Sequence, residues 1–445
     1  MFDRTLIRKY DIPGPRYTSY PTVPYWDEHT FSVNNWENEL NQIDGLEGVS
    51  LYIHLPYCES LCTYCGCNTR ITKNHKVELP YIQSLLKEWD LYKKAIGYAP
   101  VIKEVHLGGG TPTFFSPENL HYLLDRLLKD SVTDPPEISV EAHPNSTKEE
   151  HLQILYDLGS RRVSFGIQDF DLEVQRRINR IQSYEKVQKI TESARKTGYQ
   201  SINYDIIFGL PHQNKKTISD TIRKVVKLRP DRIAFYSYAH VPWLKPAQRS
   251  YEQYLPQKEE KRVLYEIGKN LLENNNYLEI GMDHFALPSD DLYKALENES
   301  LHRNFMGYTT QTTRYVIGLG VSAISDLWTA FAQNEKTVDA YQHKLEKGEF
   351  PVFRGHVLNN EDLLIRKHIL DLMCKHRTDL SGSPVYVEKL KERLEEMEKD
   401  GLIIWKKNTL YITQKGSPYS RNVCMAFDLR MLKNKPESQL FSQTV

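Results

Sequence analysis

Residues 49–68 read VSLYIHLPYCESLCTYCGCN. The apolar run at 49–54 predicts a buried strand, and four of the chain's six cysteines follow it within ten positions. Cysteines this dense in a chain otherwise poor in them indicate thiolates that bind a metal. The stretch therefore predicts a strand whose carboxyl end carries a metal-binding loop.

Beyond this stretch, short apolar runs alternate with longer amphipathic segments. Apolar residues recur at three- and four-residue steps in 81–92, 120–128 and 187–194, as in helices. Alternating strands and helices predict parallel βαβ units, arranged either as a barrel or as a doubly wound sheet. The predicted strands are 49–54, 101–107, 137–142, 162–167, 201–208, 232–238 and 277–282.

Polar or glycine-rich groups follow several of these strands, at 108–112, 168–170 and 209–211. Barrels place their active sites at the carboxyl ends of the strands. These loops and the cysteine loop are therefore expected to share one rim.

The two ends of the chain do not show this alternation of strands and helices. Residues 14–22 are turn-rich and aromatic, and their composition favours an arm lying on the surface over one that reaches a site. Helical patterns at 362–375 and 387–399 precede a β-hairpin over 401–413, which predicts a small winged-helix-like domain. We predict an arm over 1–46, a catalytic barrel with its extension over 47–355 and a C-terminal domain over 356–445.

Composition narrows the class of protein. Lys+Arg and Asp+Glu number 58 each in 445 residues, so no charge bias indicates a nucleic-acid partner. No apolar run approaches the ~18–20 residues of a membrane span, and the N-terminus lacks a signal-peptide core. We expect a cytoplasmic protein without a membrane span, in which clustered cysteines bind metal rather than form disulfides. The lone Cys374 and Cys424 are expected to be ordinary buried thiols.

The cysteine spacing allows two kinds of metal site. Cys58, Cys62 and Cys65 form C-x3-C-x2-C, and Cys67 follows. A compact zinc loop would use all four thiolates, and a zinc-structured nucleic-acid-binding protein is the corresponding function. An iron–sulfur cluster held by three cysteines would leave one iron open, whereas electron-transfer clusters use four. Because Cys65 and Cys67 are only two residues apart, we predict that Cys67 stays off the cluster.

C-x3-C-x2-C after the first strand of a βα series, with Tyr64 before the third cysteine, resembles the radical S-adenosylmethionine superfamily. The glycine-rich stretch 108–113 resembles the superfamily's element for the cosubstrate amino group. The resemblance implies a [4Fe–4S] cluster whose open iron chelates the methionine part of S-adenosylmethionine. Reductive cleavage then gives methionine and a 5′-deoxyadenosyl radical.

A closer resemblance, to the oxygen-independent coproporphyrinogen III oxidase family, covers nearly the whole chain. It implies an α/β fold, namely a partial (β/α) TIM-like barrel of the radical SAM type, with an N-terminal arm and a mostly helical C-terminal domain. Cys67 distinguishes this family from related haem chaperones, which bind haem without oxidase activity and are the alternative function. The matching motifs are 14–22, 52–68, 108–113, SFGIQDF at 164–170, EVQRRINR at 173–180, DIIFGLP at 205–211, YAHVP at 238–242, GMDHFA at 281–286, LHRNFMGYTT at 301–310, GVSAIS at 320–325 and RNVCMAFD at 421–428.

The resemblance also implies roles for single residues. Cys58, Cys62 and Cys65 would hold the cluster. Two molecules of S-adenosylmethionine are implied: the first would contact Tyr52, Gly109, Glu141 and Ile324, and the second Tyr64, Gly110, Thr111, Gln168, Arg180, Asp205 and Ala239. The residues with an implied catalytic role are Cys67, Tyr52, Glu141, Phe305 and Ile324.

The implied reaction is the oxidative decarboxylation of two propionates of coproporphyrinogen III to vinyl groups, giving protoporphyrinogen IX in haem biosynthesis. An electron donor such as flavodoxin or ferredoxin is implied, and we expect a monomer. Arg16 and Arg303 are our candidates for binding substrate carboxylates, from their charge and motifs. His143 and Met306 depart from the pattern of the family, and methionine replaces an amide poorly as a hydrogen-bonding group.

Overall fold

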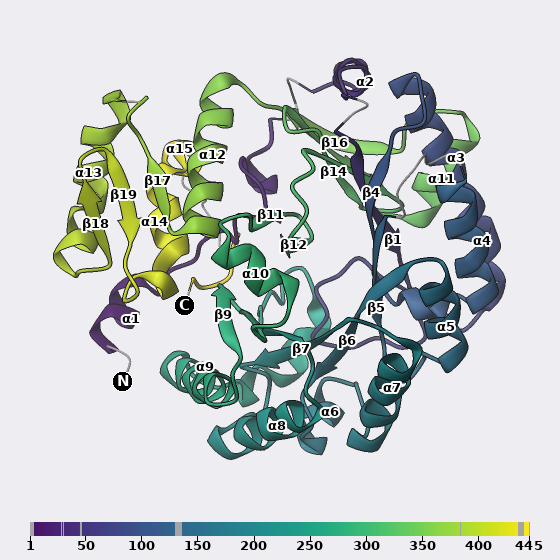
Figure 1. Cartoon of the computed structure of the whole chain (residues 1–445), viewed down its shortest axis with the longest axis horizontal. Coiled ribbons are helices and arrows are strands. Elements are labelled where there is room, and N and C mark those ends of the chain that lie inside the picture. Colours follow the sequence, from purple (N-terminus) through teal and green to yellow (C-terminus); the bar gives the residue numbers. More distant parts are fainter. Residues whose placement is uncertain are drawn as a thin grey trace.

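The computed structural model describes residues 4–27, 29, 31–44, 47–129, 136–382, 384–434 and 440–444. A curved sheet forms its centre, with helices on the outer side (Figure 1). Seven neighbouring strands of this sheet pair in parallel, in the order β13-β1-β4-β5-β6-β7-β8. They are β1 (Val49–Leu55), β4 (Ile102–Gly109), β5 (Glu137–Ala142), β6 (Ser160–Gln168), β7 (Ser201–Phe208), β8 (Arg232–Ser237) and β13 (Tyr315–Leu319).

The predicted partial barrel is confirmed: the parallel strands do not close into a ring, because antiparallel strands extend both edges of the sheet. On one side lie β14 (Ile324–Asp326), β15 (Ala330–Asn334) and β16 (Val352–Val357), and on the other β10 (His284–Ala286) and β9 (Leu278–Gly281). The prediction for 277–282 was therefore right about a strand but wrong about its direction. This strand lies in an antiparallel edge hairpin because only residues 282 and 283 separate it from its partner, too few for a parallel crossover.

Helices cover the outer face of the parallel strands. They are α3 (Glu78–Ile96), α4 (Pro117–Leu128), α5 (Glu149–Asp157), α7 (Tyr184–Thr197), α8 (Lys215–Leu228) and α9 (Lys258–Glu273). The predicted helical segments 81–92, 120–128 and 187–194 lie within α3, α4 and α7. Shorter helices in this half are α6 (Leu172–Arg177), α10 (Asp291–Glu297) and α11 (Val338–Glu346).

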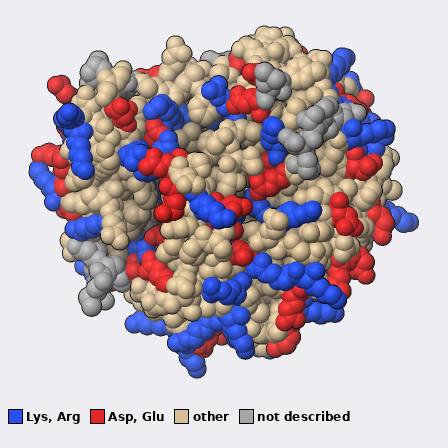
Figure 2. Space-filling model, in the orientation of Figure 1, with Lys and Arg blue, Asp and Glu red and all other residues tan. Residues whose placement is uncertain are grey.

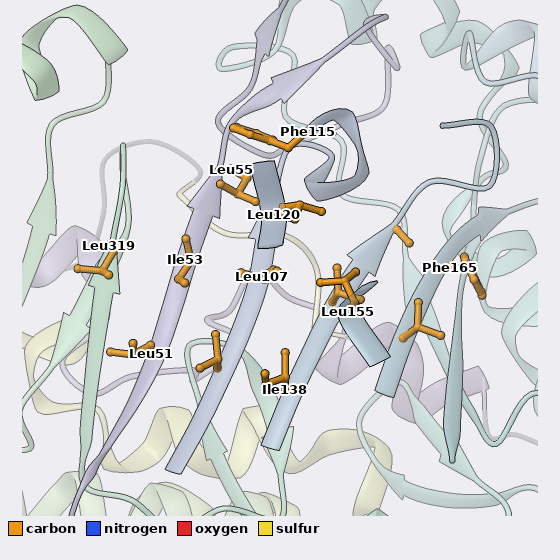
Figure 3. Close-up of a cluster of buried hydrophobic side chains, with 14 of the residues drawn as sticks. Leu51, Ile53, Leu55, Leu107, Phe115, Leu120, Ile138, Leu155, Phe165 and Leu319 are labelled. Carbon is orange, nitrogen blue, oxygen red and sulfur yellow. The ribbon is translucent and has the colours of Figure 1, made fainter. Parts of the chain in front are cut away.

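Alternation along β1 separates the core from the interior of the partial barrel. Leu51, Ile53 and Leu55 are buried in the main hydrophobic cluster together with Leu120 of α4. Figure 3 shows these residues in the layer of apolar side chains contributed by strands and helices. Because successive strand residues point to opposite faces, the intervening Tyr52 and His54 belong to the interior face of the sheet.

A second hydrophobic core joins the N-terminal arm to the C-terminal segment. Helix α1 (Arg4–Tyr10) lies beside that segment in Figure 1. Leu6, Tyr10, Tyr17 and Tyr20 of the arm pack with apolar residues that follow residue 360. The expectation that residues 14–22 lie on the surface is therefore wrong: Tyr17 and Tyr20 are 2% and 1% exposed.

The C-terminal segment has the predicted mixture of helices and a β-hairpin. The hairpin strands β18 (Ile403–Lys406) and β19 (Thr409–Ile412) pair with the short β17 (Arg377–Asp379) in a three-stranded sheet. The helices are α12 (Asn360–Lys375), α13 (Pro384–Lys399), α14 (Ser420–Phe427) and α15 (Leu429–Lys433). The domain boundaries stay predictions, and residue 46, the predicted end of the arm, lies outside the described residues. Before the barrel the arm also forms α2 (Val33–Leu40).

The face of the molecule in Figure 2 carries both acidic and basic side chains, with Lys and Arg gathered along the lower margin near α8. None of the helices within the described ranges is long and apolar enough to cross a membrane.

Arg421 of α14 fixes the arm to the C-terminal segment. Its buried guanidinium donates to the carbonyl oxygens of Gly14, of Pro15 at 2.8 Å, and of Gln443 and Thr444 at 3.0 and 3.3 Å. We predict that Arg421→Met lowers the free energy of unfolding by roughly 1–3 kcal/mol, because buried carbonyl groups lose their donors. Limited proteolysis within residues 11–20 should become faster.

Arg393→Met is the matched control, because Arg393 is exposed and donates to a single carbonyl oxygen, that of Ala426 at 2.9 Å. If limited proteolysis cleaves the arm at the same rate in Arg421→Met and Arg393→Met, Arg421 does not have this role.

Candidate active site

The cysteine loop leaves the carboxyl end of β1 and lines a cavity of about 490 Å³ inside the partial barrel. Its backbone is held by neighbouring segments. Asn179 Nδ2 donates to the carbonyl oxygen of Leu61 at 2.7 Å, and the Thr63 amide donates to that of Ile178 at 3.0 Å. Tyr251 donates its hydroxyl to the Thr63 carbonyl at 3.2 Å. The loop is therefore positioned by the barrel and not only by its own sequence.

Cys58, Cys62 and Cys65 are partly exposed and line this cavity. The Cys58 sulfur lies 3.2 Å from the Thr111 hydroxyl, and Arg180 Nη1 donates to the Cys62 sulfur at 3.6 Å. The buried Arg180 guanidinium thus places a positive charge beside these sulfurs, although burial outweighs it at Cys58 and raises the pKa of that thiol to about 11.

These three cysteines fit an iron–sulfur cluster. Within the described ranges, no three His, Cys, Asp or Glu side chains meet closely enough to hold a single metal ion. Ligands of a cluster need not meet in this way, because its iron and sulfide ions stand between them.

Cys67 is exposed, and a hydrogen bond with the Cys65 thiol raises the pKa of Cys67 well above its ordinary value. Lys245 Nζ donates to the Cys67 carbonyl oxygen at 2.7 Å. The fourth thiol therefore lies beside the third, at the mouth of the same cavity.

The glycine-rich turn after β4 is tied to the cysteine loop. The Gly110 amide donates to the Leu55 carbonyl at 2.8 Å, and the Thr111 amide to the Tyr57 carbonyl at 3.0 Å. A Cβ atom at Gly110 would lie 2.5 Å from the carbonyl oxygen of Pro56. Gly109 has φ +110°, and a Cβ atom there would lie 2.7 Å from the His54 ring. Glycine is therefore required at both positions.

Strands β5 and β7 each contribute a carboxyl group to the cavity wall. Glu141 accepts hydrogen bonds from the Gly109 amide at 3.2 Å and from His106 Nε2 at 3.3 Å. Burial alone would raise the pKa of Glu141, but these hydrogen bonds hold it below its ordinary value. Burial and the nearby Glu141 charge raise the pKa of Asp205 to about 7. Glu141 is thus an anion at neutral pH, whereas Asp205 can hold a proton.

Arg180 and Gln168 complete this part of the wall. Arg180 Nη2 donates to the Gly166 carbonyl oxygen at 2.6 Å, and its Nε has no partner in the described part of the chain. Gln168 has φ +67° at the end of β6, which turns the chain at the rim. Burial and the Arg180 charge lower the pKa of His143, also in the wall, to about 3. His143 is therefore neutral, and it accepts the Asn145 amide at 3.0 Å.

The remaining predicted residues either line the cavity or lie outside its wall. Tyr52 stacks on the cavity residue His106, with ring centroids 5.9 Å apart, and its hydroxyl lies 3.1 Å from His54 Nδ1. The carbonyl oxygens of Ala239 and Tyr64 both accept from Gln248 Nε2, at 3.4 and 3.1 Å. The predicted residues that line the cavity directly are Cys58, Cys62, Tyr64, Cys65, Cys67, Gly109, Gly110, Thr111, Glu141, Gln168, Arg180 and Asp205.

Besides Tyr52 and Ala239, four predicted residues lie outside the wall of the cavity. Ile324 and Phe305 pack together in a small apolar cluster around Trp26 and Phe331. Arg16 and Arg303 lie behind wall residues: the Arg16 guanidinium is 5.6 Å from the Tyr236 ring, and that of Arg303 is 4.5 Å from the Tyr308 ring. Met306 lines the cavity near them.

Sequence reasoning missed several residues that shape the site. Tyr52 contacts His54 through its hydroxyl and His106 through ring stacking, and His106 in turn donates to Glu141. Alternation along β1 and β4 could have placed both histidines on the interior face. Asp283 pairs with Arg16, yet nothing in the sequence pattern links two residues so far apart.

Glu88 of α3 was also missed, and it fixes the turn between β13 and β14 that carries Ile324. The Gly320 amide and the Tyr341 hydroxyl donate to Glu88 Oε2 at 2.8 and 2.6 Å, and Asn334 donates to Oε1 at 2.6 Å. Burial raises the pKa of Glu88 to about 7 despite these donors.

Comparisons with known proteins agree with this geometry. Residues 52–225 match the Radical SAM superfamily. The chain is 39% identical to the oxygen-independent coproporphyrinogen III oxidase of Helicobacter pylori, over 94% of this chain and 95% of that protein. It is 35% identical to the Synechocystis protein of the same name, over 100% and 98% of the two chains. The solved structure of coproporphyrinogen III oxidase from Escherichia coli, described as a radical SAM enzyme, superposes with a TM-score of 0.90 at 34% identity. That superposition covers 96% of this chain and 99% of the other.

The raised pKa of Glu88 predicts a pH effect on stability. The folded protein binds a proton at Glu88 more tightly than the unfolded chain, so this group stabilises the fold fully below pH 4.5, its ordinary pKa. Its contribution is lost as the pH rises to about 7. The loss is roughly 3 kcal/mol. Glu88→Gln should remove this fall between pH 5 and 7, measured as the free energy of unfolding in urea.

Glu192→Gln, on the exposed face of α7, is the control and should keep the pH dependence of the unsubstituted protein. Parallel curves for Glu88→Gln and the unsubstituted protein would exclude Glu88 as the titrating group.

Proposed function

Because the chain belongs to the oxygen-independent coproporphyrinogen III oxidases, we propose that it converts two propionate side chains of coproporphyrinogen III to vinyl groups, giving protoporphyrinogen IX. The observation that carries this proposal is the cysteine loop itself, which presents three cavity-lining thiols and the neighbouring Cys67 at the rim of a radical SAM barrel. Each vinyl group forms when a propionate loses carbon dioxide, one hydrogen atom and one electron.

Cys58, Cys62 and Cys65 are the residues that would hold a [4Fe–4S] cluster. When bound, the cluster and S-adenosylmethionine supply the 5′-deoxyadenosyl radical that removes the hydrogen atom from the propionate. The guanidinium of Arg180, 3.6 Å from the Cys62 sulfur, keeps positive charge beside the thiolates. Thr111, 3.2 Å from the Cys58 sulfur, adds a hydroxyl donor.

We infer that the cavity binds two molecules of S-adenosylmethionine, and several wall residues support this. For the first, Glu141 is an anion that can accept an ammonium or ribose hydroxyls, and Gly109 lets the backbone approach closely. Tyr52 and Ile324 flank this part of the barrel. For the second, Arg180 can bind a carboxylate through its guanidinium, whose Nε is unpaired among the residues that the structure describes. The further contacts proposed for the second molecule are Tyr64, Gly110, Thr111, Gln168, Asp205 and Ala239.

The catalytic roles of Cys67, Tyr52, Glu141 and Phe305 are part of the same proposal. Cys67 lies at the cavity mouth with a thiol that stays protonated at neutral pH, so it can transfer a hydrogen or proton. Ile324 is proposed to contact the first S-adenosylmethionine and Phe305 to line the substrate side, and both side chains pack against the apolar cluster of Trp26, Phe331 and Leu358. The one-electron donor is proposed to be a flavodoxin or ferredoxin, and the protein to work as a monomer in the cytoplasm.

Substitution of single cysteines tests the assignment. Anaerobic turnover of coproporphyrinogen III with S-adenosylmethionine and a reductant should give protoporphyrinogen IX and 5′-deoxyadenosine. We expect Cys67→Ser to keep the iron and sulfide content of the unsubstituted protein but to lose product formation by about 10²-fold or more. Cys62→Ser should instead lose the iron.

Cys374→Ser is the control, because this thiol is buried outside the cavity. Loss of iron from Cys67→Ser would make Cys67 a ligand. Formation of 5′-deoxyadenosine without any vinyl product in the unsubstituted protein would exclude coproporphyrinogen III as the substrate.

A further inference from the structure

Arg303 of β11 (His302–Asn304) is a buried cation with unused hydrogen-bond donors. It is 4% exposed, and its Nε and Nη1 have no partner among the described residues. Its Nη2 donates to the backbone oxygen of Arg16 at 3.2 Å. Leaving a buried donor unpaired is costly, and the cost is larger for a charged group. Such a group therefore calls for an anionic partner that is absent here.

The surroundings of Arg303 carry an excess of positive charge. Arg16, Lys261 and Arg421 lie close enough to Asp283 to interact with it, and Arg16 forms an ion pair with it. Burial together with the Arg16 charge lowers the pKa of Arg421 to about 9. The donors of Arg421 are taken by four backbone oxygens, so it cannot serve an added anion.

This group of cations stands directly behind one wall of the cavity. The guanidinium of Arg303 covers the ring of Tyr308, and that of Arg16 covers the ring of Tyr236. Both tyrosines line the cavity, and so does His284, whose ring contacts each of them with centroids 5.5 Å apart. Burial and the Arg303 charge lower the pKa of His284 to about 3, so the histidine adds no positive charge.

The position of the group also separates it from the cysteine loop. Tyr236 belongs to β8 and His284 to β10, whereas the cysteine loop follows β1, and β4 to β7 lie between them in the sheet. A carboxylate bound here would be held at a different part of the cavity from the cluster.

We propose that Arg303 and Arg16 bind a carboxylate of the substrate, namely a propionate that is not being decarboxylated while another lies near the cluster. Asp283 is the internal counter-ion that the substrate carboxylate displaces from Arg16. Guanidinium groups bind carboxylates with two parallel hydrogen bonds, which orients the substrate as well as binding it. This inference rests on the proposed function, because it takes the substrate to be a tetrapyrrole with several propionates.

Binding of coproporphyrin III, a stable tetracarboxylate, and of its uncharged tetramethyl ester tests the proposal, with porphyrin fluorescence as the readout. The unsubstituted protein, loaded with its cluster, should prefer the acid. Arg303→Gln should reduce this preference by about tenfold or more, and Arg303→Lys by less. Asp283→Asn should increase affinity for the acid several-fold, because it removes the competing carboxylate. If Arg303 and Asp283 had only a structural role, Arg303→Gln and Asp283→Asn would both weaken binding of the acid.

Arg126→Gln on the exposed face of α4 changes the net charge equally and is the control. Iron content and the thermal midpoint verify that each variant folds. An acid-to-ester preference that stays unchanged in Arg303→Gln, or that falls in Asp283→Asn, would overturn the carboxylate site even if turnover is normal. If the acid is preferred and Arg303→Gln removes that preference, but no vinyl product ever forms, the carboxylate site is supported and the proposed function is refuted.

Discussion

The parallel pairing of β1 with β4 is the constraint on which the site depends. It brings the carboxyl ends of both strands to one edge, where the amides of Gly110 and Thr111 donate to the carbonyls of Leu55 and Tyr57. The cysteine loop and the glycine-rich turn are thereby fixed to each other by backbone hydrogen bonds. Because Cβ atoms at Gly109 and Gly110 would collide with His54 and Pro56, the two segments can approach this closely only with glycine there.

Charges are distributed unevenly around the cavity. Near the cysteines, Arg180 faces the sulfurs, while Glu141 and Asp205 supply carboxyl groups with pKa values shifted in opposite directions. Behind the wall formed by Tyr236 and Tyr308, cations are in excess. This polarity suits a cavity that must hold the ammonium and carboxylate of a small cosubstrate near one part and the carboxylates of a larger substrate at another.

Much of the fold could be predicted from local patterns, because apolar strands and amphipathic helices carry their periods in sequence. The six parallel strands from β1 to β8 were placed within one or two residues. The strand β13 was missed because it enters the sheet beside β1 from far along the chain. The burial of Tyr17 and Tyr20 could not be foreseen either, since it depends on the packing partner supplied by residues after 360.

The site could be predicted as far as motifs extend. The rim position of the cysteine loop follows from the alternation of strands and helices, whereas Glu141 and Arg180 were predicted from the family resemblance. All of them meet at one cavity. Pairings such as Arg16 with Asp283, and Glu88 with Gly320, join distant segments through tertiary structure alone. Ile324 and Phe305 pack against an apolar cluster, and their contacts with the cofactor and the substrate stay predictions.

The central claim is that this cavity brings S-adenosylmethionine and a propionate of the substrate together for hydrogen transfer. Coproporphyrinogen III deuterated at the propionate β-carbons tests it most directly, with the mass of the 5′-deoxyadenosine formed during anaerobic turnover as the measurement. We expect one molecule of 5′-deoxyadenosine, carrying one deuterium, for each vinyl group formed. Vinyl product accompanied by unlabelled 5′-deoxyadenosine would contradict it.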